Sequence, residues 1–267
     1  MSLISDLFRL GAALSLAAAA AVPASTEELA PQQPQLSCTA PAELTRIDHP
    51  LPRTARKLAA GQPIKIVAVG SSSTFGAGAS TPATSYPSRL EAELKALFPR
   101  ASITVLNRGV GGEIARDMLA RFDDDVIAEN PDIVVWQLGS NSVLRQLPIT
   151  PAKSTIRQGL AKLKAAKADI ILMNPQYAPK VVAKPNIDHM VDLINAAAKE
   201  GNVDLFQRFA VMRYWRLTED MPFSAFLSAD ELHLNDWSYG CLAKLLAGSI
   251  SEAATRPTLT ATAKPRG

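Results

Sequence analysis

The stretch IKIVAVGSSSTFG, residues 64–76, decides the fold. A short apolar run rich in β-branched residues predicts a strand buried on both faces, and the small residues after it predict a turn into a helix. Further apolar runs alternate with longer helical patterns as far as residue 250. The predicted strands cover residues 64–69, 103–106, 133–138, 170–173 and 203–206, and the predicted helices cover residues 86–98, 113–122, 151–168, 186–199 and 236–250. This alternation indicates an α/β domain with a five-stranded parallel sheet covered on both faces.

The chain divides by composition into four segments. Residues 1–24 predict a secretory signal peptide, because the apolar run LGAALSLAAAAAV follows Arg9 and precedes small residues. The run is shorter than the roughly 20 residues that cross a bilayer, so an uncleaved anchor is the less favoured alternative. Residues 25–62 predict a proline-rich arm or linker, residues 63–252 the α/β domain, and residues 253–267 a disordered tail. The signal peptide predicts a periplasmic or secreted protein with no stable membrane span after cleavage.

The composition of the 267 residues, 47% hydrophobic and 20% charged, is that of a globular protein. The net charge of +3 is small and the basic residues are scattered, which argues against nucleic acid as a partner. Cys38 and Cys241 are the only cysteines. Export would allow them to pair, and two separately buried thiols are equally compatible with the sequence. Neither has a neighbouring histidine, so no metal site is predicted. The composition does not indicate the oligomeric state.

Loops at the carboxyl ends of parallel strands form the ligand crevice, so the candidate site lies there. A serine nucleophile needs an adjacent histidine, which needs a carboxylate to orient it. Of the three histidines, His233 is in a loop with Asp230 three residues before it, a spacing that can bring the carboxylate to Nδ1. Taken alone, Asp-x-x-His is more often a surface or capping pair. The first loop offers three neighbouring serines, residues 71–73, between which the residue types alone do not choose.

The same loops hold candidate donors for the oxyanion of an acyl-transfer transition state. Ser72 offers its own N–H at the strand-to-helix turn. The glycine pair Gly111-Gly112 lets the backbone approach a ligand closely, and Asn141 offers a side-chain amide. Each signal is weak alone, but together they follow consecutive strands. The pattern therefore favours acyl-transfer chemistry at this edge of the predicted sheet.

Four blocks, residues 70–72, 107–112, 139–141 and 230–233, resemble those of the SGNH hydrolase (GDSL-type esterase/lipase) superfamily. The resemblance covers residues 64–250 and implies a flavodoxin-like three-layer α/β/α sandwich. It also implies cleavage of carboxylic esters or thioesters without a metal or organic cofactor. It assigns Ser72 as the nucleophile, His233 as the general base and then acid, and Asp230 as the orienting carboxylate. The Ser72 and Gly112 amides and the Asn141 side chain would form the oxyanion hole.

Three positions depart from the family pattern. Ser71 replaces the usual Asp beside the nucleophile, Ser142 replaces the Asp that often follows the third-block Asn, and Leu234 replaces the Pro that often follows the His. None removes an atom from the predicted triad or oxyanion hole. The first two remove carboxylates that could support the loops, so low activity or an unusual substrate range is one expectation.

Other chemistries fit the sequence less well. A phosphate-binding loop would need Lys where Ala77 stands, and a dinucleotide-binding motif would need Gly where Ile114 stands. The Gly-x-Ser-x-Gly motif of α/β-hydrolases is absent around Ser72. Two alternatives to an esterase stay open: a non-catalytic carbohydrate or lipid binding protein of the same fold, and an acyltransferase with the same triad.

The substrate is the least determined feature of the sequence. We expect a small-molecule or polysaccharide ester, either a carbohydrate acetyl ester or a small lipid ester. Residues 206–227 hold much of the aromatic content just before the Asp-x-x-His loop. These aromatic residues either line an acyl pocket or pack that end of the core.

Overall fold

The computed structural model describes residues 36–256, in which five strands form one parallel sheet in the order β2-β1-β3-β4-β5. The strands are β1 (Ile64–Gly70), β2 (Ile103–Gly109), β3 (Ile133–Gln137), β4 (Asp169–Met173) and β5 (Asp204–Phe206). This strand order and direction are those of a flavodoxin-like doubly wound sheet. The predicted α/β fold class is therefore confirmed.

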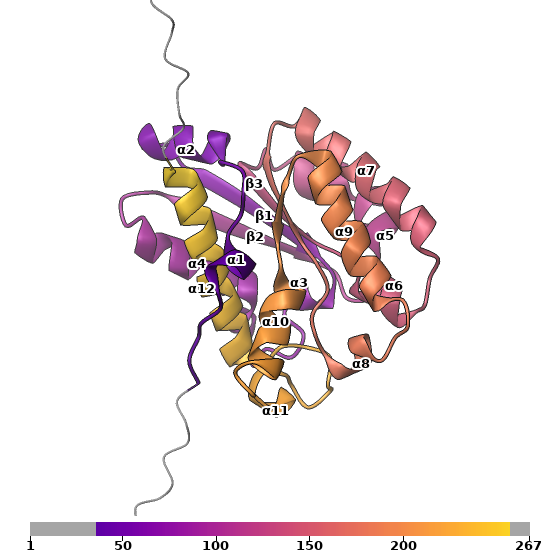
Figure 1. Cartoon of the computed structure of the whole chain (residues 1–267). Coiled ribbons are helices and arrows are strands. Elements are labelled where there is room, and N and C mark those ends of the chain that lie inside the picture. The colour runs from indigo at the N-terminus through magenta and orange to yellow at the C-terminus, as the bar shows by residue number, and fades with distance from the viewer. Residues whose placement is uncertain (1–35, 257–267) are drawn as a thin grey trace, which may run out of the picture. The chain divides into compact units, whose positions relative to one another are not determined.

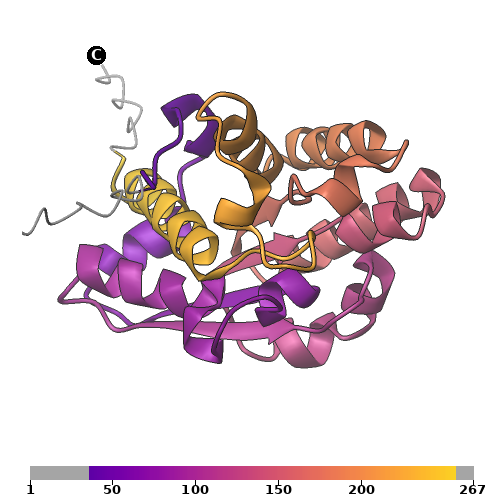
Figure 2. The ribbon, with the colours of Figure 1, turned by 90° about the horizontal axis from the view of Figure 1, so that it is seen from below.

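Helices cover both faces of the sheet, which explains why its strands are apolar throughout. Every residue of β3 and β4 is buried, and in β1 only Lys65 is not fully buried. One face carries α4 (Tyr86–Leu97) and α12 (Asp236–Thr255), and the other carries α5 (Ala115–Ala120), α7 (Ile149–Ala165) and α9 (Ile187–Gly201) (Figures 1 and 2). Each fully buried Val or Ile stabilises the fold by about 1.5–3 kcal/mol relative to the exposed side chain.

Shorter helices stand in the connections between these elements. They are α1 (Ala42–Thr45), α2 (Pro52–Ala59), α3 (Ser72–Phe75), α6 (Ser140–Leu144), α8 (Pro179–Val182), α10 (Arg208–Leu217) and α11 (Phe223–Phe226), with a 3₁₀ turn at Pro82–Thr84. The helix predicted over residues 113–122 is shorter than expected and continues as a π-helical turn, Asp123–Ile127. Pattern reading misses most of the short helices because four residues are too few to establish a period.

Residues 38–62 differ from the predicted arm or linker, since they pack against the domain. Ile47 and Leu51 are each 1% exposed, and Cys38 forms a disulfide with Cys241 of α12. From Cys38 onward the described residues belong to one compact unit. The proline-rich composition of this segment predicts a linker, but the buried side chains of Ile47 and Leu51 anchor it to the domain.

Three aspartates at the amino ends of β3, β4 and β5 also hold this segment. Asp132, Asp169 and Asp204 have almost no exposed surface, and each accepts hydrogen bonds from residues 49–57. These bonds include Arg53 Nε to Asp132 (2.6 Å), Thr54 N to Asp169 (2.8 Å) and His49 N to Asp204 (2.9 Å). Burial raises the pKa of Asp169 and of Asp204 more than their hydrogen bonds lower it. For Asp132 the opposite holds, because the donors Lys57, Lys65 and Arg53 outweigh burial and lower its pKa.

The predicted C-terminal boundary at residue 252 falls inside α12, which continues to Thr255 because Ala253 and Ala254 are buried. The predicted signal peptide and the tail beyond residue 256 lie outside the described residues. Within residues 36–256, no helix has both the length and the apolar character needed to cross a membrane.

Candidate active site

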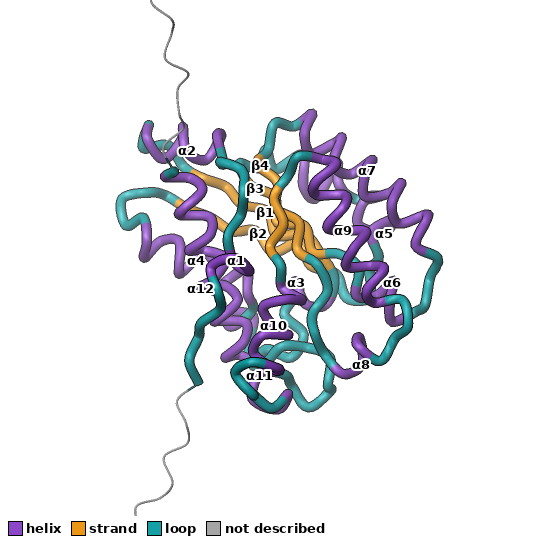
Figure 3. The backbone as a smooth tube through the Cα atoms, in the orientation of Figure 1, coloured by secondary structure: helices purple, strands orange, loops and turns teal. Residues whose placement is uncertain are grey.

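The loops that hold the predicted site residues lie at one edge of the sheet, where the strands have their carboxyl ends. Figure 3 shows loops gathered there around α3, α6 and α11, below the sheet in that view. Consecutive connections leave β1 and β3 toward opposite faces, so a crevice opens between these two strands. Ser72 follows β1 and Asn141 follows β3, which places the loop of the predicted nucleophile and the loop of the predicted oxyanion donor, here called the oxyanion loop, on either side of that opening.

Ser72, His233 and Asp230 form a continuous hydrogen-bonded chain. His233 Nε2 lies 2.8 Å from Ser72 Oγ, and His233 Nδ1 lies 2.5 Å from Asp230 Oδ2. The His233 side chain is 14% exposed and that of Asp230 is 44% exposed. The imidazole is therefore largely shielded from solvent, and the carboxylate behind it is the more exposed of the two. In this arrangement the imidazole can take the serine proton while the carboxylate fixes its tautomer.

The turn that presents His233 is built around the carboxylate of Asp230. Its Oδ1 accepts hydrogen bonds from Ser228 Oγ (2.7 Å), Leu232 N (2.9 Å) and His233 N (2.9 Å). Glu231 has a φ of 57°, which folds the turn tightly enough for these bonds to form. Burial raises the pKa of Asp230, but these donors together with the imidazole lower it well below its usual range. The carboxylate is therefore ionised at every pH at which a histidine base can act.

A buried glutamine supports the serine turn. Gln137 Oε1 accepts hydrogen bonds from Ser71 N (2.9 Å), Ser71 Oγ (2.9 Å) and Thr74 Oγ1 (3.3 Å), and the Gln137 side chain is 1% exposed. These donors hold both ends of the four-residue helix that begins at Ser72. Ser71 therefore supports the loop through an uncharged contact with β3, and no sequence motif indicates this contact.

Two of the three loops that hold the predicted oxyanion donors, those of Gly112 and Asn141, are bonded together. Asn141 Nδ2 donates to the carbonyl of Glu113 (2.9 Å), and the neighbouring carbonyl of Gly112 accepts from Arg145 Nη2 (2.6 Å). Gly112 has a φ of 81°, a conformation that favours glycine. Among the described residues no acceptor bonds the N–H of Ser72 or of Gly112. Both amides, and the second N–H of Asn141, are thus available to a ligand.

A second buried glutamine joins the oxyanion loop to the histidine loop. Gln176 Oε1 accepts from Ser140 Oγ (2.5 Å) and from Arg208 Nη2 (2.9 Å), while its Nε2 donates to the carbonyl of Leu232 (3.4 Å). Arg208 is completely buried and has no carboxylate partner among the described residues. Burial lowers the pKa of Arg208 to about 10, so the guanidinium is still charged at neutral pH. Sequence reasoning missed both residues, because neither belongs to a motif.

The aromatic segment before the Asp-x-x-His loop is mainly core. Six of its aromatic and methionine side chains are buried: Phe206, Phe209, Met212, Trp215, Met221 and Phe226. Trp215 packs edge-on against Phe226, with ring centroids 5.9 Å apart. The sequence left open whether these aromatic residues line an acyl pocket or pack the core, and most of them pack the core.

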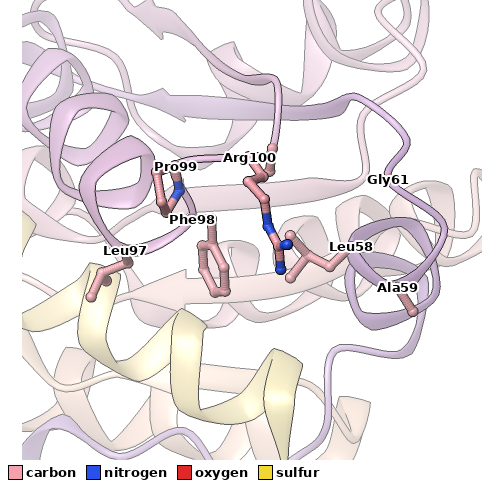
Figure 4. A pocket seen from close by; sticks show the side chains of 8 residues that line it. Leu58, Ala59, Gly61, Leu97, Phe98, Pro99 and Arg100 are labelled. Carbon is pink, nitrogen blue, oxygen red and sulfur yellow. The ribbon is translucent and has the colours of Figure 1, made fainter.

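Two hollows differ in their relation to the site. An open hollow of about 540 Å³ lies where β1 and β2 begin, between Leu58 and Phe98, at the edge opposite Ser72 (Figure 4). A smaller apolar pocket of about 190 Å³ lies next to the oxyanion loops, lined among others by Ile114, Ser142 and Pro151. Ser142, one of the departures from the family pattern, is therefore part of an apolar wall. This pocket is smaller than the roughly 300 Å³ usual for ligand sites, and neither Ser72 nor His233 lines it.

Residues 36–256 contain no group of three or more His, Cys, Asp or Glu side chains that could hold a metal ion. The groups present at the carboxyl edge of the sheet are those of nucleophilic acyl transfer. They comprise a hydroxyl bonded to an imidazole, a carboxylate behind the imidazole, and backbone and amide donors in the neighbouring loops.

Comparison with known proteins agrees with this geometry. The model of the Non-GDSL lipase-like family matches residues 37–256. An acetylxylan esterase of Geobacillus stearothermophilus is 36% identical over 104 residues, 35% of this chain and 48% of that protein. An arylesterase of Vibrio mimicus is 27% identical over 130 residues, 46% of this chain and 64% of that protein. The chain thus matches about half to two thirds of the length of these relatives. The crystal structure of a two-domain esterase active on acetylated mannans shares the fold, with a TM-score of 0.67, 20% identity, and coverage of 83% of this chain and 58% of that one.

Proposed function

The chain belongs to the Non-GDSL lipase-like family, within the SGNH hydrolase superfamily, and on this premise we propose that it is a serine esterase. The observation that carries the proposal is the hydrogen-bonded chain from Ser72 Oγ through His233 to Asp230. In the proposed reaction, His233 Nε2 takes the proton from Ser72 as the hydroxyl attacks the ester carbonyl. The alcohol then leaves with that proton, and an acyl-enzyme remains on Ser72.

The oxyanion would be bound by the N–H groups of Ser72 and Gly112 and by the Asn141 side chain. Asn141 is supported by its bond to the Glu113 carbonyl, and Gly112 by Arg145, so these donors would need little rearrangement when charge develops. In the second half-reaction His233 would take a proton from water, which attacks the acyl-enzyme. The proton would then return to Ser72 as the carboxylic acid leaves. This step regenerates the starting hydrogen bond.

For the substrate we propose a short acyl ester, with the acetyl ester of a carbohydrate as first choice and a small lipid ester as second. Relatives whose names specify acetyl esters support a short acyl group. Relatives named as an acetylxylan esterase and as an esterase active on acetylated mannans support the carbohydrate. We further propose that the protein is exported, on the strength of the apolar run after Arg9 and of the disulfide.

The proposal is tested with the p-nitrophenyl esters of acetate, butyrate and octanoate, assayed beside the Ser72→Ala protein. We expect turnover of acetate and butyrate, little of octanoate, and none in the variant. A sulfonyl fluoride should inactivate the wild type, with peptide mass mapping of the adduct to Ser72. Turnover of no ester by a correctly folded wild type would contradict the proposal and favour a non-catalytic binding protein. Acyl transfer to an added sugar in preference to water would favour an acyltransferase.

A further inference from the structure

The solvent-facing side of α3 consists of two residues only. In this four-residue helix Ser73 and Thr74 are buried, Ser72 is half-buried and Phe75 is 63% exposed. Residues three apart in a helix are neighbours on its surface. Phe75 therefore lies one turn after Ser72 on the part of α3 that is open to solvent.

The exposure of Phe75 does not come from a loosely held backbone. Asn107 Nδ2 donates to the carbonyls of Thr74 (2.9 Å) and Phe75 (3.3 Å). Gly109, at the end of β2, lies so close that a Cβ there would collide with the backbone of Phe75. Strand β2 thus fixes the main chain of Phe75, and the Phe75 ring stays exposed.

Val110 extends this apolar surface. It follows Gly109, is 44% exposed, and donates its N–H to the carbonyl of Gly70 at the end of β1 (3.0 Å). The described residues expose four large hydrophobic side chains, and two of them, Phe75 and Val110, follow the adjacent strands β1 and β2 at the edge that carries Ser72. Contiguous exposed apolar surface on a folded protein marks sites that bind a ligand or a partner.

We propose that Phe75, with Val110 beside it, is a platform on which a sugar ring of the substrate stacks, so that the ester hydrolysed at Ser72 is carried by an oligo- or polysaccharide. This inference rests on the proposed esterase function and specifies its substrate. The face of a pyranose ring presents C–H groups, and the face of an aromatic ring is electron-rich, so the two attract each other.

The test compares kcat/KM on acetylated xylooligosaccharides with kcat/KM on p-nitrophenyl acetate, which has no sugar. The variants are Phe75→Ala, Phe75→Leu and Phe75→Trp, with Leu217→Ala as control. Leu217 is 57% exposed at the end of α10. For Phe75→Ala we expect the ratio of the two values to fall about three- to tenfold, mainly through KM on the oligosaccharide. Phe75→Leu should behave like Phe75→Ala, Phe75→Trp should retain the ratio, and the control should match the wild type.

The outcomes separate the inference from the proposed function. An unchanged ratio in Phe75→Ala, or a wild-type ratio in Phe75→Leu, overturns the stacking platform although the enzyme is an esterase. A wild type that hydrolyses p-nitrophenyl acetate but no acetylated oligosaccharide overturns it as well. A folded wild type that hydrolyses neither substrate overturns the proposed function itself. Circular dichroism of each variant establishes that the compared proteins are folded.

Discussion

His233 Nε2 lies 2.8 Å from Ser72 Oγ although the two residues are 161 positions apart in the chain. Ser72 begins the helix that leaves β1, and His233 precedes α12, which packs against α4 on the same face of the sheet. The distance between the two side chains is therefore set by the packing of α12 against α4, and by the turn around Asp230.

The serine that acts as nucleophile can be identified with its own neighbour as control. Ser72→Ala should lower kcat by about 10⁴- to 10⁶-fold, because it removes the attacking oxygen. Ser73 is fully buried and its hydroxyl has no hydrogen-bond partner among the described residues, so Ser73→Ala should retain activity and lose no stability. Kinetics on p-nitrophenyl acetate and thermal denaturation check both. Loss of activity in Ser73→Ala would mean that the motif has been read in the wrong register.

The side chain of Asn141 should contribute to kcat and little to KM. Asn141→Ala removes a donor aimed at charge that exists only in the transition state, so we expect kcat to fall by about 10²- to 10³-fold. Asn107 provides a comparison, since its amide binds the carbonyls of Thr74 and Phe75 and is committed to structure. Asn107→Ala should lower thermal stability as well as activity. An Asn141→Ala protein with unchanged kcat would exclude this residue from the oxyanion hole.

The bond from Ser140 to Gln176 predicts coupling between the oxyanion loop and the histidine loop. Ser140→Ala removes one donor to Gln176 Oε1 and should lower kcat up to about tenfold with little change in KM. Ser154→Ala is the matched control, because Ser154 lies at an exposed position of α7 and its Oγ donates only to the carbonyl of Pro151. A double-mutant cycle with Gln176→Ala should show that the two losses are not additive. Additive losses would indicate that the two loops are positioned independently.

Two buried aspartates at the other edge of the sheet predict opposite effects of pH on stability. The pKa of Asp132 is lowered in the fold, so its carboxylate contributes stability above the ordinary aspartate pKa, and this is lost on acidification. Asp132→Asn should therefore cost about 1–3 kcal/mol at neutral pH and progressively less in acid. The measurement is chemical denaturation at several pH values.

For Asp204 the sign is reversed, because its pKa is raised in the fold and the protonated form is favoured there. That contribution is present below the ordinary aspartate pKa and is lost as pH rises through the raised value. The Asp204→Asn protein should thus have a free energy of unfolding similar to that of the wild type at neutral pH. In acid its free energy of unfolding should be lower than that of the wild type. If the free energy of unfolding changed with pH in the same way for Asp132→Asn and Asp204→Asn, the opposite pKa shifts of the two aspartates would be contradicted.

The regular part of the fold was predictable from sequence because strands such as Ile133–Gln137 are apolar on both faces and helices between them are long. Ser72 and the pair Asp230 and His233, which the structure joins by hydrogen bonds, could be selected from the sequence because they stand in short motifs. Gln137 and Gln176 were not, since each acts through a buried amide whose partners come from distant loops. A lone glutamine at the end of a strand carries no spacing signal.

The N-terminal segment shows a second limit of sequence reading. Prolines and glutamines suggested an arm or linker, but Ile47 and Leu51 are buried, and Trp215 Nε1 donates to the carbonyl of Thr39 (2.9 Å). Isolated apolar residues in a polar stretch do not make a periodic pattern. Their burial follows from the disulfide at Cys38 and the aspartates at the strand ends, which no local pattern reveals.

The disulfide between Cys38 and Cys241 joins residues 203 positions apart, so it closes nearly the whole domain into a covalent ring. All five strands lie inside this ring, as do Ser72, Asp230 and His233. A protease that cuts one exposed loop opens the ring but does not release a fragment, and the two sides of the cut stay tethered. Separation of the serine from its histidine requires either a second cut or reduction of the bond. A singly nicked protein should therefore migrate as one species without reductant, as two fragments with it, and refold as a single molecule.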